Sequence, residues 1–134
     1  MSVESFLLSS GYSIPAIGFG TWEPVESQRS AILEATLIAL KTGYRHIDTA
    51  WIYGSERFVG EAIRKSRVPR REIFITTKVY CDKTRKVVDI SWNHMHTNVE
   101  KSVDMSLQNL GQGIGYIDLL LIHCAISIMI SFDV

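Results

Sequence analysis

The 134-residue sequence is poor in cysteine and has no net charge, and each shortage excludes a class of protein. Its two cysteines, Cys81 and Cys124, are too few for a disulfide framework, which favours a reducing, cytoplasmic setting. Lysine plus arginine and aspartate plus glutamate number 14 each, so no global field attracts nucleic acid or an anionic membrane. The N-terminal segment has no basic residue before its short apolar run, so we expect no secretory signal.

Long apolar runs are missing as well. The most apolar stretch, Leu119 to Phe132, contains His123 and is shorter than the roughly 20 residues that a membrane-spanning helix needs. We therefore expect no membrane span. Residues 124–134 are interpreted as a divergent apolar tail after a partial domain of residues 1–123, with a membrane tether as the alternative interpretation.

The apolar periodicity that is present predicts strands alternating with helices. A hairpin and the first strand share residues 5–22, and residues 81–96 have no clear period and are expected to form a loop. Helices are expected at Ser27–Thr42, Glu56–Ser66 and Thr97–Leu110. Further strands are expected at Tyr44–Ala50, Glu72–Tyr80 and Tyr116–His123. This order predicts an α/β fold with a parallel sheet. A flavodoxin-like open sheet and part of a (β/α)8 barrel both satisfy it.

Local signals add three predictions about how these elements begin and pack. Ser55 is expected to cap the helix that starts at Glu56. Thr97, with Glu100 completing a capping box, is expected to cap the last helix. The apolar run 119–122 predicts a strand that is buried on both faces.

Two motifs that suggest other functions have simpler interpretations. Five basic residues within 64–71 fit the end of a helix and a solvated loop, because no aromatic residues are interleaved as in a nucleic-acid site. His94 and His96 have no carboxylate or cysteine at a useful spacing, so we expect no metal site.

Polar side chains of complementary chemistry follow the predicted strands. Because function collects at the carboxyl ends of parallel strands, we expect these side chains on one face of the sheet. An ammonium beside a phenol favours loss of the phenol proton, so Lys78 is expected to assist Tyr53 as a proton donor. Asp48 is expected to fix Lys78, and His123 to orient a carbonyl oxygen. Given an external hydride, this set suits carbonyl reduction. Taken singly, each also fits a structural ion pair, a turn aromatic or a core histidine.

The stretch Gly43–Gly60, with GYRHIDTA followed by Glu56 and Val59-Gly60, resembles the first signature of the aldo-keto reductases. IPAIGFGTW resembles that family's N-terminal hairpin and first barrel strand, and VPRREIFITTK resembles its third strand. SLQNLG and YIDLLLIH resemble its third helix and fourth strand. The resemblance implies the N-terminal half of a (β/α)8 TIM barrel preceded by a β-hairpin.

The resemblance also implies NADPH-dependent reduction of an aldehyde or ketone, a small-molecule substrate, to an alcohol. In the family pattern the proton donor falls on Tyr53, its lysine and aspartate on Lys78 and Asp48, and the carbonyl-orienting histidine on His123. The nicotinamide contacts fall on Thr21, Trp22 and Asp48. The substrate pocket falls on Trp22, Ile52, Tyr80 and His123. His46 shares the signature but is interpreted as packing.

Two departures from the family pattern limit these expectations. Residues 81–96 are longer than the family's corresponding loop, and residues 124–134 do not resemble the loop that the family places after its histidine. The family's phosphate contacts for NADPH lie mostly in its C-terminal half. We therefore expect little turnover from this chain alone. The alternative is a non-catalytic half-barrel that associates with a partner, such as another half-barrel, through open sheet edges.

Overall fold

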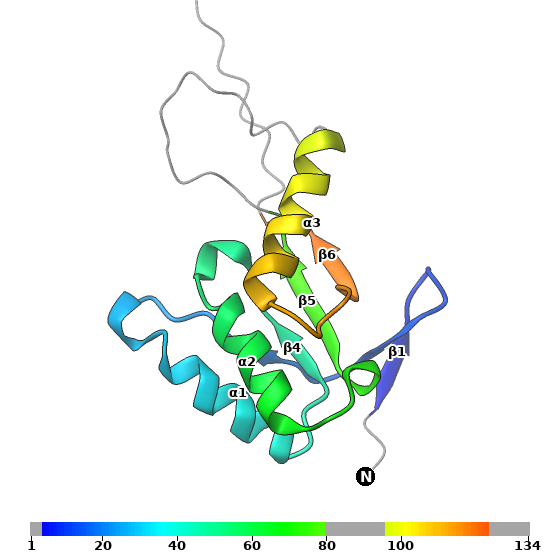
Figure 1. The fold of residues 1–134 in the computed structure, drawn as a ribbon. Helices are drawn as coiled ribbons and strands as arrows, with labels where there is room; N and C mark the ends of the chain where they lie inside the picture. The colour runs from blue at the N-terminus through cyan, green and yellow to red at the C-terminus, as the bar shows by residue number, and fades with distance from the viewer. Residues whose placement is uncertain (1–3, 80–95, 124–134) are drawn as a thin grey trace, which may run out of the picture.

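A computed structural model describes residues 4–79 and 96–123, excluding the side chains of residues 96–98. A four-stranded parallel sheet and three helices make up most of it (Figure 1). The strands lie in chain order: β3 (Phe19–Gly20), β4 (His46–Asp48), β5 (Phe74–Lys78) and β6 (Leu119–Leu121). The helices are α1 (Ala31–Lys41), α2 (Glu56–Ser66) and α3 (His96–Leu110). A separate antiparallel hairpin pairs β1 (Ser5–Leu7) with β2 (Ser13–Pro15).

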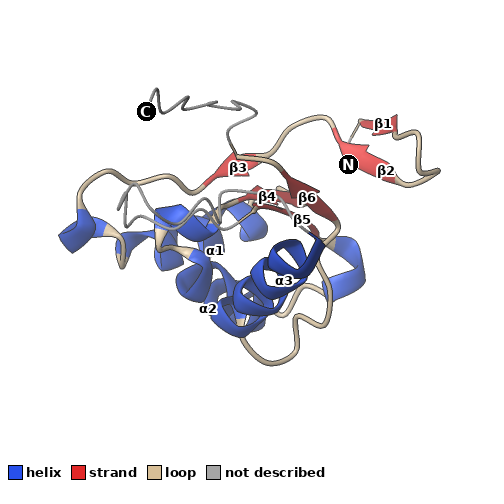
Figure 2. Ribbon diagram, turned by 90° about the horizontal axis from the view of Figure 1, so that it is seen from above, coloured by secondary structure: helices blue, strands red, loops and turns tan. Residues whose placement is uncertain are grey.

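The elements form two layers, which Figure 2 shows from above. All three helices lie on one face of the sheet, and no described helix covers the other face. The core lies between the layers and contains Ile47 of β4 and Ile75 of β5, both fully buried. Since side chains alternate along a strand, Asp48 and Lys78 fall on the face without helices.

The predicted order of elements is confirmed. α2 has the predicted bounds, whereas the strands and the first helix are shorter than predicted. The first helix begins at Ala31 rather than Ser27, because residues Glu26–Gln28 form a separate 3-10 turn, η1. The last helix begins at His96, so Thr97 lies inside its first turn and not at the predicted N-cap position. Two further 3-10 turns, η2 (Trp51–Tyr53) and η3 (Arg70–Glu72), lead out of β4 and into β5.

The prediction that the last strand is buried on both faces is wrong. Leu121 is 39% exposed and Ile122 is 53% exposed. β6 is the last strand of the described sheet, so its outer edge has no described neighbour, and helices cover only one of its faces. An apolar run indicates that a strand favours burial, but the elements packed beside the strand determine whether it is buried.

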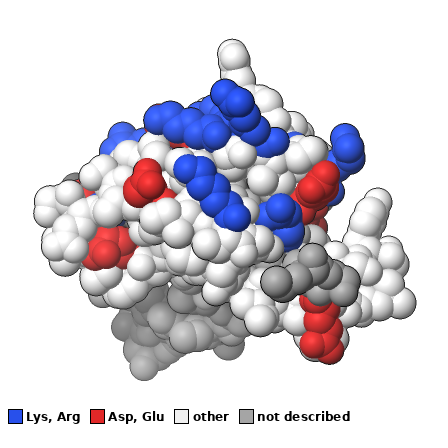
Figure 3. Space-filling view, turned by 90° about the horizontal axis from the view of Figure 1, so that it is seen from below, with Lys and Arg blue, Asp and Glu red and all other residues white. Residues whose placement is uncertain are grey.

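Two arginines of the basic stretch 64–71 bind the segment that connects α3 to β6. Arg64 donates to the carbonyl oxygens of Leu110 and Gln112, at 2.8 and 3.3 Å. Arg70 donates to the carbonyl oxygen of Tyr116 at 2.7 Å and forms a 2.7 Å ion pair with Asp118. Figure 3 shows Lys and Arg side chains gathered on this side of the molecule, with acidic groups among them. These contacts support the structural interpretation of the basic stretch.

The described residues bear on two kinds of function, membrane insertion and metal binding. Among them, no helix combines the length and apolar character needed to cross a membrane. Residues 4–79 and 96–123 also contain no cluster of three or more His, Cys, Asp or Glu side chains arranged to hold a metal ion. His94 and the tail 124–134 lie outside the described residues.

Gly60 sets the distance between α2 and α3. A Cβ added there would lie 1.7 Å from the carbonyl oxygen of Leu110, the last residue of α3. That oxygen also accepts the Arg64 hydrogen bond, and a backbone atom cannot rotate away as a side chain can.

We therefore expect Gly60→Ala to reduce the free energy of unfolding by about 3 kcal/mol, as overpacking does. In an exposed helix the same change is stabilising by about 1 kcal/mol, so the sign of the effect is diagnostic. Chemical denaturation measures it, with the exposed helix substitution Glu34→Ala as the control. A Gly60→Ala protein as stable as the parent would contradict the close approach.

Candidate active site

The ion pair between Asp48 and Lys78 joins the carboxyl ends of β4 and β5. The Lys78 Nζ lies 2.7 Å from Oδ1 of Asp48 and donates a second hydrogen bond, of 3.0 Å, to the carbonyl oxygen of Thr49. The side chain of Lys78 is 14% exposed and that of Asp48 is 33% exposed. Two hydrogen bonds therefore hold Lys78, and the pair is still reachable from solvent.

Tyr53 and His123 complete a group of four side chains at this end of the sheet. Tyr53 stands on η2, which ends at Gly54 in a left-handed conformation, with φ of 65°. The Lys78 ammonium lies 4.8 Å from the centre of the Tyr53 ring. The His123 ring, two residues after β6, meets the Tyr53 ring edge to face, with centroids 5.4 Å apart. The structure thus brings together four residues that are distant in sequence.

The environment of His123 favours its neutral form. Burial lowers the pKa of its imidazole, the Lys78 ammonium lowers it further, and the Asp48 carboxylate partly offsets both. A neutral imidazole has one N–H donor and one acceptor nitrogen. Near neutral pH, His123 can therefore donate a hydrogen bond to an oxygen without carrying charge.

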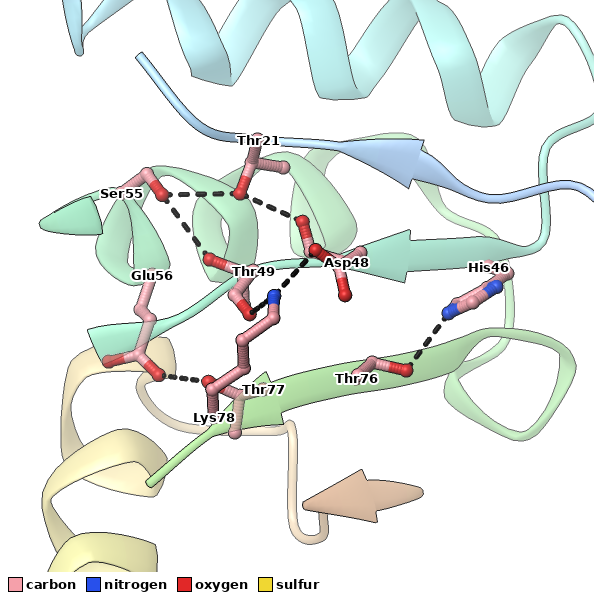
Figure 4. Close-up of polar contacts among 9 residues, drawn as sticks. All are labelled: Thr21, His46, Asp48, Thr49, Ser55, Glu56, Thr76, Thr77 and Lys78. Carbon is pink, nitrogen blue, oxygen red and sulfur yellow. Dashed lines mark hydrogen bonds and ion pairs between the residues drawn. The ribbon is translucent and has the colours of Figure 1, made fainter. Parts of the chain in front are cut away.

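Three buried hydroxyl groups hold the backbone behind Asp48 (Figure 4). Thr21 donates to the carbonyl oxygen of Asp48 at 3.0 Å, and its hydroxyl lies 3.2 Å from that of Ser55. The Ser55 hydroxyl also lies 3.2 Å from that of Thr49. Ser55 occupies the N-cap position of α2, but its side chain makes no capping hydrogen bond. The expected cap is therefore wrong in its chemistry, because this hydroxyl bonds to the strand ends instead.

The sequence places Glu56 at the start of its helix but does not predict that its carboxylate is buried. This first-turn carboxylate is almost fully buried, accepting 2.8 Å hydrogen bonds from the Thr77 hydroxyl and from the Asn109 amide. Burial raises its pKa, and its hydrogen bonds oppose that rise. Glu56 thereby ties α2 to β5 and α3, one residue away from Lys78. Its only sequence signal is its place in the signature after Tyr53.

His46 lies on the same face as Asp48, as its position two residues earlier requires. Its Nε2 is 2.9 Å from the Thr76 hydroxyl, and its ring meets Phe74 edge to face at 5.3 Å. Burial lowers the pKa of His46. A Cβ on Gly18 would lie 2.7 Å from the His46 ring, so a glycine is needed beside it. These contacts support the packing interpretation.

The other predicted site residues are less closely joined to the four. The Thr21 side chain is fully buried, so it supports Asp48 rather than facing solvent. Trp22 is 62% exposed beside it, and Ile52 is half-buried on η2. Tyr80 lies outside the described residues.

Comparison with known proteins identifies the family of this chain. The sequence model of the aldo/keto reductase family matches residues 16–128. The chain belongs to the aldo/keto reductase family. It is 44% identical over 122 residues to glycerol 2-dehydrogenase (NADP(+)) of Saccharomyces cerevisiae and 42% identical over 122 residues to aldehyde reductase YPR1 of the same yeast. Each alignment covers 91% of this chain and 34% of the relative.

Solved aldo-keto reductases share the fold. A Bombyx mori aldo-keto reductase in complex with NADP superimposes with a TM-score of 0.76 at 34% identity, covering 91% of this chain and 38% of that one. The four parallel strands and their helices are thus part of the (β/α)8 barrel of this family. The chain spans about a third of the length of the curated relatives that it matches.

Lys78 and Asp48 act on the pKa of His123 in opposite directions, so removing each charge is expected to shift that pKa in opposite directions. Lys78→Met is expected to raise the pKa of His123, because it removes a cation that lowers it. Asp48→Asn is expected to lower that pKa, because it removes the opposing carboxylate. NMR titration of the ring protons measures both, with His123→Gln to assign the signal.

The exposed substitution Lys65→Met is the control, since Lys65 forms its ion pair with Glu61 on α2. It is expected to leave the His123 titration unchanged. Shifts of the same sign in the Lys78 and Asp48 variants would contradict the described arrangement.

Proposed function

We propose that this site protonates the carbonyl oxygen during NADPH-dependent reduction of an aldehyde or ketone to an alcohol. The observation that carries the proposal is the convergence of Tyr53, Lys78, Asp48 and His123 at the carboxyl ends of three strands and their following turns. The names of the yeast relatives support a carbonyl or alcohol substrate, and the Bombyx mori complex supports NADP as the cofactor. An aldehyde is the substrate that we would test first, and a cytoplasmic location is part of the proposal.

Each of the four side chains has its own role in the proposed reaction. The Tyr53 hydroxyl gives its proton to the substrate oxygen, and the Lys78 ammonium stabilises the negative charge that the phenol oxygen acquires. Asp48 holds Lys78 within 2.7 Å. His123, favoured as neutral, donates a hydrogen bond that orients the carbonyl. When bound, NADPH supplies the hydride.

The described residues fit one end of that cofactor. The exposed indole of Trp22 offers a flat apolar surface, and the partly exposed Asp48 carboxylate can accept a hydrogen bond from an amide. Thr21 fits less well as a direct contact, because its hydroxyl is buried against Asp48 and Ser55. Arg64 and Arg70 bind loop carbonyl oxygens, so they are committed elsewhere and we assign them no phosphate.

A chimera tests the assignment of Tyr53 in a closed barrel. Residues 16–123 would replace the matching segment of a full-length relative, so that the relative supplies the remaining strands. Tyr53→Phe in this chimera is expected to lower kcat by about 10²- to 10⁴-fold, the usual worth of general-acid catalysis. A chimera whose NADPH oxidation is unaffected by Tyr53→Phe would contradict the assignment.

The 134-residue chain alone is expected to turn over slowly. Its described sheet is not closed, so water reaches the ion pair and weakens its field. With NADPH and an aromatic aldehyde we expect kcat below about 1 s⁻¹, under the range of ordinary enzymes. Tyrosine-dependent turnover within that range would show that closure is unnecessary.

A second candidate function is association through the sheet edges, without catalysis. The specific observation is that β3 and β6 each have a neighbour on one side only among the described strands. The two candidates differ in what they require. Catalysis requires Tyr53, whereas association requires the edges and tolerates Tyr53→Phe.

A further inference from the structure

Glu56 is a buried carboxylate to which the proposed reaction gives no role. It is 1% exposed and lies in the first turn of α2, the helix that follows the Tyr53 turn. Its Oε1 accepts a 2.8 Å hydrogen bond from the Thr77 hydroxyl of β5, and its Oε2 accepts one of the same length from the Asn109 amide of α3. Burying a carboxylate costs free energy that an apolar side chain would not cost, so its presence between these elements needs a reason.

We propose that Glu56 is a positioning residue for Lys78 and acts through the Thr77 hydroxyl. Successive side chains of a strand point to opposite faces of the sheet, so Thr77 faces the helices and Lys78 faces the candidate site. The Glu56–Thr77 hydrogen bond therefore fixes β5 from behind, at the residue before Lys78 (Figure 4). On the other face, Lys78 itself is held by the Asp48 carboxylate and the Thr49 carbonyl oxygen. The end of β5 is thus held from both faces.

The placement of Lys78 matters because its ammonium acts on two neighbours. It lies 4.8 Å from the centre of the Tyr53 ring, and it lowers the pKa of His123. Both effects depend on distance, because the interaction of a charge weakens as the separation grows. The inference rests on the proposed function, which gives Lys78 its role in catalysis, but the positioning can be measured without NADPH or a substrate.

His123 reports the position of Lys78 without responding directly to Glu56. Among the described residues, the charges that act on the pKa of His123 are those of Lys78 and Asp48. A variant that breaks the Glu56–Thr77 hydrogen bond and leaves the fold intact is therefore expected to shift that pKa through Lys78.

Thr77→Val removes the hydroxyl with little change in shape. We expect it to raise the pKa of His123, by less than Lys78→Met does, because the ammonium that lowers this pKa is held less closely. In a Lys78→Met background, Thr77→Val is expected to cause no further shift, because no ammonium remains to be displaced. NMR titration of the 134-residue chain measures both, and circular dichroism confirms that each variant is folded. No shift in the parent, or an equal shift in both backgrounds, would overturn the proposal.

Two matched variants separate this hydrogen bond from the other contacts of the carboxylate. Asn109→Ala removes the second 2.8 Å hydrogen bond, which leads to α3 rather than to β5. Glu56→Gln removes the negative charge but keeps an oxygen that can accept from the Thr77 hydroxyl. Both are expected to leave the His123 titration as in the parent.

Thr77→Ala takes the place of Thr77→Val if the latter does not fold. A rise in the pKa of His123 in Asn109→Ala or Glu56→Gln as large as that in the Thr77 variant would overturn the proposal. Failure of the proposed function would instead appear as turnover that is insensitive to Tyr53→Phe in the chimera, so the two failures are distinguishable.

Discussion

The ion pair between Lys78 and Asp48 is the contact on which the candidate site depends. It fixes the relative positions of the carboxyl ends of β5 and β4, and it places an ammonium 4.8 Å from the Tyr53 ring. The same ammonium helps to keep His123 neutral. Loss of one partner would leave the other charge partly buried without compensation, a large penalty in proteins. One interaction therefore acts on both the proposed proton donor and the group proposed to orient the substrate.

The N-terminus of α2 supports this pair through contacts that replace ordinary helix capping. Ser55 directs its hydroxyl to Thr21 and Thr49, whose backbones flank Asp48, and Glu56 accepts a hydrogen bond from Thr77, beside Lys78. Burying a carboxylate is costly unless it is hydrogen-bonded, and here two donors satisfy it. The helix start is thereby anchored to both strand ends. Side chains on these strand ends are held more precisely than a loop alone would hold them.

Much of the fold follows from local sequence patterns, whereas the contacts beneath the site do not. The strand and helix periods of β4, α2 and β5 are visible in short windows, and so is the rule that polar residues after parallel strands share one face. Glu56 meets a partner 53 residues away, and no local window contains that information. Leu121 shows the converse. Its apolar run is unmistakable, but its exposure depends on whether another strand lies beside it.

The geometry of this site and the strength of its electrostatic field have different physical origins. The distances among Asp48, Lys78 and Tyr53 depend on two neighbouring strands and one turn, all within the described chain. Their electrostatic effect depends instead on the surrounding medium, because a charge acts more strongly where water is excluded. The Asp48 side chain is still 33% exposed, so water weakens the pair. Strands that cover this face would strengthen the field at Tyr53 while leaving the distances unchanged. Geometry and electrostatic strength are therefore separable properties here: described strands and a turn set the distances, whereas the exclusion of water sets the strength of the field.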